Sequence, residues 1–242
     1  QRRHQGARDV QGGAHQPPLC MVHGTKDKIV PYVQAEKIMA RAHAVGLGGA
    51  SLRRLGWGTG YGDFDLDGRL DLFVLNGHVY PQADEAGTDT SYAQANQLFL
   101  QSKSGRFEER EFSGPARTNR AGVTADLDGD GDLDIISLEL GGPARVWENT
   151  TLDTSRDELA PTPWLGVRLA GSGAQGARLE LSYEVDGAEV VRHAYMRTAA
   201  GFQASAPLAA HLVAEGYERG ASAVLRVRWL GGELSELELD SL

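Results

Sequence analysis

The chain has 242 residues, a formal net charge of −9 and 31 glycines. This length allows one large domain or two modest ones that bury roughly 70% of the unfolded surface. The negative charge disfavours nucleic acid and anionic membranes as partners, because both are bound mainly through Lys and Arg. The single cysteine, Cys20, excludes an internal disulfide and a cysteine-based zinc cage. The chain contains no run of about 18 apolar residues, so no transmembrane segment is predicted.

The N-terminal fifty residues divide into two parts. Residues 1–18 are polar and unpatterned, which favours a disordered lead-in. Residues 19–50 have an α/β pattern, in which Leu19–Val22 reads as a short buried strand and Tyr32–Val45 as a helix. Gly46 stands where a helix C-cap is expected. A glycine-rich boundary then separates this segment from the next.

Residues 52–150 change to short apolar runs broken by Gly, Asn and Asp, which is typical of β structure. Two segments align when Asp63 is laid over Asp126, and each acidic stretch is followed by an apolar run, Leu70–Leu75 or Leu133–Leu140. This internal repeat favours propeller-type blades over a helical solenoid. Two blades are too few to close a propeller, so we expect an incomplete one.

The two acidic stretches have the sequences D-F-D-L-D-G-R-L-D and D-L-D-G-D-G-D-L-D. Both place carboxylates at positions 1, 3, 5 and 9 and a glycine at 6, where the chain must turn sharply around an ion. A backbone carbonyl at position 7 would complete an all-oxygen shell, which suits Ca²⁺. Val74 or Ser137 replaces the glutamate that an EF-hand has at position 12. The predicted calcium ligands are Asp63, Asp65, Asp67, Arg69, Asp71, Asp126, Asp128, Asp130, Asp132 and Asp134.

These stretches resemble a known family. Gly56–Pro81, Asn96–Glu109 and Thr124–Thr150 are similar to FG-GAP/VCBS repeats, the calcium-bearing blades of integrin-α-like β-propellers. The resemblance implies bound calcium and a location outside the cytoplasm. Trp57 and Trp147 are then expected to pack within the blades rather than to bind sugars.

Residues 151–163 form a polar, proline-bearing linker, and residues 164–242 read as a separate β unit. Asp186-Gly187 between two valine-rich runs predicts a hairpin, and Gly171–Gly176 is also read as a hairpin turn. The predicted strands are Trp164–Leu169, Ala177–Val185, Val190–Met196 and Val224–Leu230.

This C-terminal unit resembles the ASPIC/UnbV domain of cartilage acidic protein-like proteins. The resemblance lies in Trp164–Gly187, Gly201-Phe202 and Leu225–Gly232. The chain departs from the family pattern at Leu230, where a proline is usual after V-R-W. The resemblance implies a β-sandwich-like domain and recognition of a protein or glycan ligand.

Residues 17–46 resemble a different family, the C-terminal part of α/β-hydrolases of the prolyl oligopeptidase and esterase type. In that family an H-G-x-x-D-x-x-V-P segment carries the triad aspartate, and Asp27 takes this position. A triad also needs a nucleophile and a base, and no G-x-S-x-G motif occurs anywhere in the chain. Asp27 is therefore expected to be an orphan acid without catalytic partners.

The sequence as a whole predicts a mainly β protein. It combines two FG-GAP/VCBS repeats, an ASPIC/UnbV-like β domain and a short α/β remnant in front. We expect a non-enzymatic calcium-binding module that is extracellular, periplasmic or at the cell surface and that serves recognition or adhesion. The alternative is a derivative of a serine hydrolase that retains only the triad acid.

Overall fold

A computed structural model describes residues 40–51, 53–85, 89–112, 114–152, 162–240 and 242. These residues contain thirteen strands in four antiparallel sheets, which confirms a mainly β fold. The predicted strand Leu19–Val22 and most of the predicted helix lie outside the described residues. Residues 40–44 are helical, and Gly46 follows with a φ of 95°, as expected for a C-cap. No helix among the described residues is long and apolar enough to cross a membrane.

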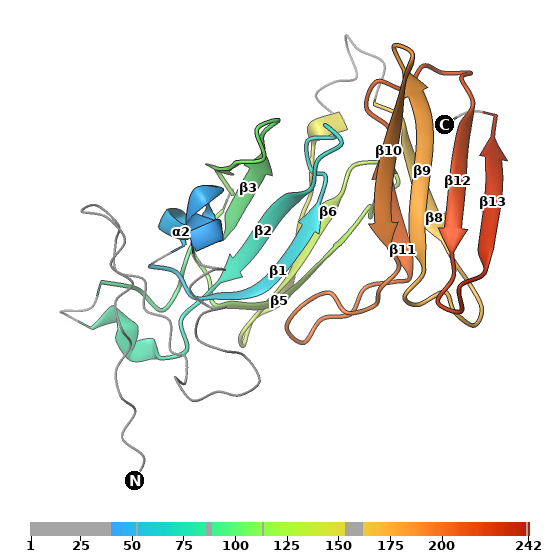
Figure 1. Cartoon of the computed structure of the whole chain (residues 1–242). Coiled ribbons are helices and arrows are strands. Elements are labelled where there is room, and N and C mark those ends of the chain that lie inside the picture. The colour runs from blue at the N-terminus through green and yellow to red at the C-terminus, as the bar shows by residue number, and fades with distance from the viewer. Residues whose placement is uncertain (1–39, 52, 86–88, 113, 153–161, 241) are drawn as a thin grey trace.

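Residues 56–147 form two sheets that repeat one plan (Figure 1). In each sheet the acidic stretch connects the first strand to the second, and neighbouring strands follow one another in sequence. Among the described residues, the first sheet has four strands and the second has three. The first sheet contains β1 (Gly56–Gly62), β2 (Asp71–Asn76), β3 (Gln97–Gln101) and β4 (Phe107–Arg110), and the second contains β5 (Asn119–Ala125), β6 (Asp134–Glu139) and β7 (Ala144–Trp147). The short helices α2 (Leu47–Ala50) and η1 (Pro81–Asp84) lie outside the sheets.

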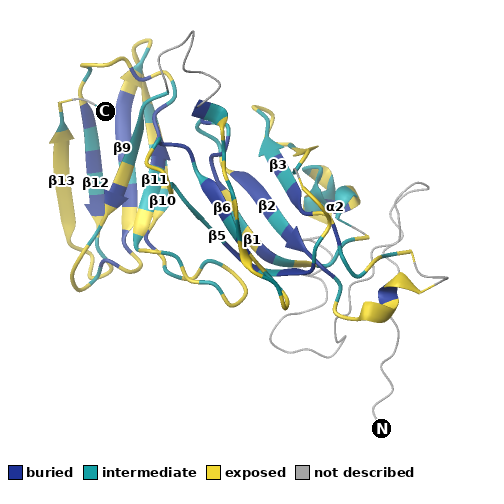
Figure 2. Cartoon of the chain, turned by 180° about the vertical axis from the view of Figure 1, so that it is seen from behind, coloured by how far each residue is buried: buried dark blue, intermediate teal, exposed yellow. Residues whose placement is uncertain are grey.

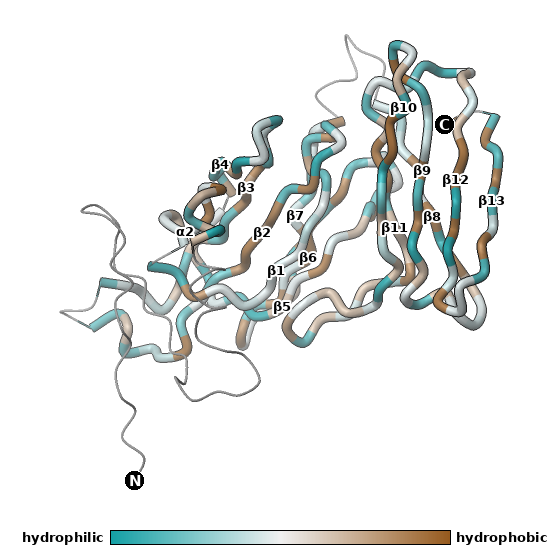
Figure 3. Tube along the Cα trace, in the orientation of Figure 1, coloured by the Kyte–Doolittle hydropathy of each residue, from teal (hydrophilic) through white to brown (hydrophobic). Residues whose placement is uncertain are grey.

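The two sheets pack against each other through their first strands, β1 and β5, which lie side by side in Figure 1. Glycines make this close approach possible, because a Cβ on Gly58 would lie 2.9 Å from the backbone nitrogen of Gly122. Phe73, Leu75 and Ile135 fill the space between the sheets and are almost fully buried. Their strands appear as brown, apolar segments in Figure 3. The described residues do not close a propeller.

The C-terminal unit, described over residues 162–240 and 242, has two sheets around one core. A four-stranded sheet has the order β10-β9-β12-β13, and a two-stranded sheet pairs β11 with β8. Val167 and Leu212 of the smaller sheet join Leu181 and Leu225 of the larger one in a single buried cluster. Figure 2 shows the buried strands β9 and β12 and the exposed edge strand β13. The strands are β8 (Trp164–Arg168), β9 (Arg178–Val185), β10 (Ala188–Tyr195), β11 (Ala209–Val213), β12 (Ala223–Arg228) and β13 (Leu234–Leu239).

The two predicted hairpins have different outcomes. Asp186 and Gly187 do connect β9 to β10, and their φ values of 52° and 77° fit a tight two-residue turn. The hairpin predicted at Gly171–Gly176 is wrong, because β8 and β9 belong to different sheets. This glycine-rich segment is a crossover between the two layers of the C-terminal unit.

Candidate metal centre

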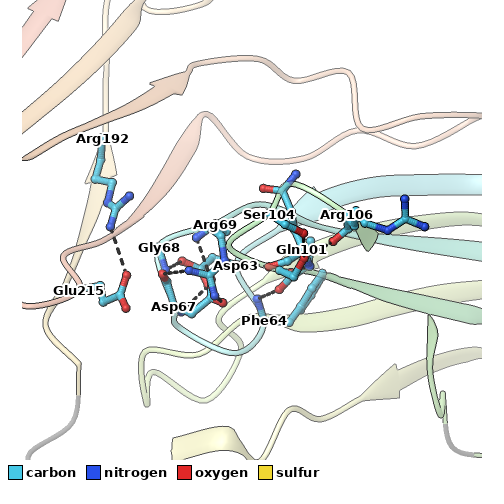
Figure 4. Close-up of polar contacts among 12 residues, drawn as sticks. Asp63, Phe64, Asp67, Gly68, Arg69, Gln101, Ser104, Arg106, Arg192 and Glu215 are labelled. Carbon is cyan, nitrogen blue, oxygen red and sulfur yellow. Dashed lines mark hydrogen bonds and ion pairs between the residues drawn. The ribbon is translucent and has the colours of Figure 1, made fainter. Parts of the chain in front are cut away.

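The first acidic loop, Asp63–Asp71, wraps around its first carboxylate. Asp63 accepts hydrogen bonds from the backbone N–H groups of Asp67 at 3.0 Å and Gly68 at 2.8 Å (Figure 4). Gly68 has a φ of 77°, a conformation that favours glycine. The predicted sharp turn at position 6 is therefore present, and it brings the far side of the loop back to Asp63.

The second acidic loop, Asp126–Asp134, is a chain of short-range turns. Asp126 accepts from the N–H of Gly129 at 2.8 Å, and Asp130 accepts from the N–H of Asp132 at 3.0 Å. Asp132 is only 1% exposed, and one of its oxygens accepts from the N–H of Leu152 at 3.1 Å. The loop is thus attached at its base to the start of the linker, while Asp128 stays exposed.

The last aspartate of each loop fastens the loop to its sheet in the same way. Asp71 accepts from the N–H of Phe64 at 2.9 Å and from the N–H of Gln101 at 2.8 Å. Asp134 accepts from the N–H of Leu127 at 3.0 Å and from the N–H of Asn149 at 2.9 Å. The aspartate at position 9 therefore has a structural role that the alignment of the two loops does not reveal. Both of its carboxylate oxygens accept hydrogen bonds from backbone N–H groups.

Three carboxylates converge in each loop. Asp63, Asp65 and Asp71 form one group, Asp126, Asp128 and Asp130 form the other, and within each group the oxygens lie within 4.8 Å of one another. Oxygens that share one calcium ion at about 2.3–2.6 Å are at most about 5 Å apart, so this spacing fits a common shell. The two groups could hold a metal ion.

Carboxylate oxygens without hydrogen-bond partners also favour a cation site in these loops. Among the described residues, one oxygen each of Asp65, Asp130 and Asp132 is shielded from solvent without a hydrogen-bond partner. A buried carboxylate oxygen without a partner is costly, and a bound cation supplies the missing interaction. The donor set contains only oxygen, which suits a hard divalent cation.

The electrostatics of the loops agree with this interpretation. Burial, reinforced by the neighbouring Asp71 and Asp65, raises the pKa of Asp63 to about 7. Burial likewise raises the pKa of Asp71 to about 6 and that of Asp132 to about 6, with nearby carboxylates adding to the effect. Carboxylates in this state are poorly stabilised by the protein alone. A divalent cation would favour their ionised forms.

The remaining predicted ligands have other positions. The guanidinium of Arg69 forms an ion pair with Asp67 and also donates to the carbonyl of Gln101 at 2.8 Å (Figure 4). The Asp67 carboxylate therefore faces the Arg69 guanidinium and not the group formed by Asp63, Asp65 and Asp71. The second loop has Asp132 where the first has Arg69, so the second loop carries more negative charge. The assignment of these remaining residues as metal ligands stays a prediction; they are Asp67, Arg69, Asp132 and Asp134.

Leu66 is a structurally important residue of the first loop that the alignment of the two loops did not single out. Its φ of 58° is unusual for a non-glycine residue and costs about 1–2 kcal/mol. The matching residue of the second loop is Gly129, with a φ of 80°. The alignment of Leu66 with a glycine of the second loop was the sequence signal that could have indicated a left-handed backbone at this position. Leu66 is only 4% exposed, and its burial offsets the conformational cost.

Trp57 and Trp147 are both half-buried, and the Trp57 ring contacts the C-terminal unit rather than packing only within its own blade. Trp57 donates to the carbonyl of Gly77 at 2.8 Å, and its ring lies 5.0 Å from that of Phe202. Trp147 donates to the hydroxyl of Ser137 at 2.8 Å. Asp27, the predicted orphan acid, lies outside the described residues.

Comparison with protein-family models shows that residues 63–137 match the FG-GAP-like repeat. Comparisons with curated proteins and with solved structures return no significant match. The matched span starts at the first ligand candidate of the first loop and ends within β6, so it contains both acidic loops. Residues 63–137 of this chain are therefore an FG-GAP-like repeat with two acidic clusters that could hold metal ions.

Proposed function

We propose that this chain is a non-enzymatic calcium-binding module of a protein that works outside the cytoplasm. The repeated convergence of three carboxylates, with shielded oxygens that lack partners, carries the proposal. Calcium is favoured over magnesium because irregular loops with several carboxylates adapt to six to eight oxygens, whereas magnesium demands a tight octahedron. Millimolar extracellular calcium matches the affinity of about 10⁻⁴–10⁻³ M expected of such modules.

Thermal unfolding in calcium and in EDTA tests the metal site. At 10 mM calcium, a site with this affinity stabilises the folded chain by about 1.4–2.7 kcal/mol. For a chain of this size, that corresponds to a rise of roughly 3–11 °C in Tm per occupied site. The same concentration of magnesium is expected to give a smaller rise. An unchanged Tm in calcium would refute the proposal.

A charge-matched pair of variants makes the test specific. Asp65→Ala combined with Asp128→Ala removes one carboxylate from each converging group, and the calcium-dependent rise in Tm should disappear. Glu238→Ala combined with Asp240→Ala removes the same charge from exposed positions near the C-terminus and should keep the full rise. Loss of the rise in both variants would mean that net charge, not the loops, controls the response.

The biological task that we propose is recognition or adhesion, with a protein or glycan as ligand. The support is the resemblance of residues 164–242 to an ASPIC/UnbV domain, together with the two-sheet core of this unit. Glycan-array binding in calcium and in EDTA tests the glycan arm of the proposal. Calcium-dependent binding to a defined class of glycans supports it, whereas signals that EDTA does not change count against it.

We further propose that the hydrolase-like segment is catalytically inactive. The support is the sequence itself, since Asp27 has neither a G-x-S-x-G nucleophile nor an assigned base beside it. The purified chain should therefore hydrolyse p-nitrophenyl esters no faster than its Asp27→Asn variant. A rate that depends on Asp27 would instead favour the serine-hydrolase derivative.

A further inference from the structure

Both acidic loops contact the C-terminal unit, in addition to the contact between Trp57 of β1 and Phe202. The first contact is apolar. Leu66, between two aspartates of the first loop, packs with Leu152 and with Val213 at the end of β11. Leu66 and Val213 are each 4% exposed, and the three residues form a cluster separate from both main cores. Of the two leucines in the first acidic loop, Leu66 is thus buried against the C-terminal unit, whereas Leu70 is exposed.

The second contact fixes the second loop. His211 on β11 hydrogen-bonds through Nε2 to the carbonyl of Gly131 at 2.8 Å, and Nε2 must donate because a carbonyl only accepts. Trp164 on β8 stacks on His211 with ring centroids 5.3 Å apart. Trp164 also lies so close to Gly131 that a Cβ there would overlap its indole nitrogen. The turn at position 6 of this loop therefore lies against a stacked pair of rings from the C-terminal unit.

The third contact is electrostatic. The guanidinium of Arg192 on β10 lies against Gly68 of the first loop, where a Cβ would overlap it. Arg192 also pairs with Glu215 at 3.6 Å, and Figure 4 shows this pair beside the loop. All three contacts involve positions between or beside the candidate calcium ligands.

We infer that the acidic loops are part of the docking surface for the C-terminal unit, and that calcium binding and docking stabilise each other. The inference rests on the proposed function and deepens it. A bound ion fixes the loop backbone that presents Leu66 and the Gly131 carbonyl, and docking in turn holds the carboxylates in their converging positions. Such coupling is reciprocal, because each event stabilises the conformation that the other one requires.

Calcium titration calorimetry on two matched variants of the full chain tests the inference. Val213→Ala removes the contact with Leu66 without changing a candidate ligand, and we expect calcium affinity to fall at least about fivefold. Val227→Ala truncates a similarly buried valine, 7% exposed, in the core of the C-terminal unit. Its calcium affinity should stay within about twofold of the original. Equal affinities in the two variants would overturn the inference.

Hydrogen exchange on the unaltered chain gives a second readout that does not depend on a variant folding. Calcium should slow exchange of the backbone amides of β8 and β11, which contain no candidate ligand. Slowed exchange confined to the acidic loops would overturn the coupling and leave the calcium site intact. A chain that binds no calcium at all in the titration would instead refute the proposed function, and the inference with it.

Discussion

The close approach of β1 and β5 makes Gly58 sensitive to substitution. In Gly58→Ala, the new Cβ lies 2.9 Å from the nitrogen of Gly122 and 3.0 Å from the carbonyl carbon of Ala121. Ordinary contacts of this kind are about 3.5–4.0 Å, so the strands must separate by roughly half an ångström. The neighbours are backbone atoms, which cannot rotate away. Overpacking of this kind costs about 1–3 kcal/mol.

Urea and thermal unfolding in EDTA measure this effect without any contribution from calcium. The expected loss lowers Tm by roughly 2–12 °C for a chain of this size. Gly49→Ala is the matched control, because a Cβ at Gly49 in α2 meets nothing within 4 Å. Alanine in a helix should leave the Tm unchanged or raise it slightly. Equal stability of the two variants would show that the sheets do not pack through β1 and β5 as described.

Four further substitutions test individual side chains of the two repeat sheets and their acidic loops. Asp71→Asn should lower the free energy of unfolding by about 1–3 kcal/mol even in EDTA, because its amide NH₂ would face a buried backbone N–H. Asp128 is exposed, so Asp128→Asn should lower the free energy of unfolding only in calcium. Urea unfolding with and without calcium compares Asp71→Asn with Asp128→Asn, and identical behaviour of the two variants would contradict their different roles. Arg69→Gln should raise calcium affinity about fivefold in low-salt calorimetry, since removing a unit charge near the site is worth about 1 kcal/mol or more; unchanged affinity would mean that Arg69 does not compete. Trp147→Phe leaves the hydroxyl of Ser137 unpaired and should cost about 1–3 kcal/mol, and most of this loss should vanish in a Ser137→Ala background.

The acidic loops were predictable because their geometry is local. Asp63 accepts from N–H groups four and five residues ahead, and Asp126 accepts from one three residues ahead. Glycine at position 6 is likewise a local requirement of the backbone. The Asp186-Gly187 hairpin follows the same rule, since a two-residue turn specifies its own strands. In each case the information lies within about ten consecutive residues.

The strands of the C-terminal unit were predictable only in part. The predicted bounds of β8 and β9 agree with the structure to within one residue at each end. The sheet to which each strand belongs was not predictable, and the hairpin expected between them is a crossover. β8 pairs instead with β11, where Ala209 lies opposite Arg168. Apolar runs specify that a strand is buried, but not which distant strand completes its hydrogen bonds.

The sequence by itself determined the two acidic loops, their glycine turns and the mainly β character of the chain, because spacing along the backbone controls all three. The tertiary structure decided that Asp71 and Asp134 fasten the loops to their sheets. It also decided that Leu66 packs on Val213 and that His211 reaches Gly131, residues separated by 80 positions or more. No local pattern encodes such contacts, since they arise only when two separate cores have formed and their surfaces meet.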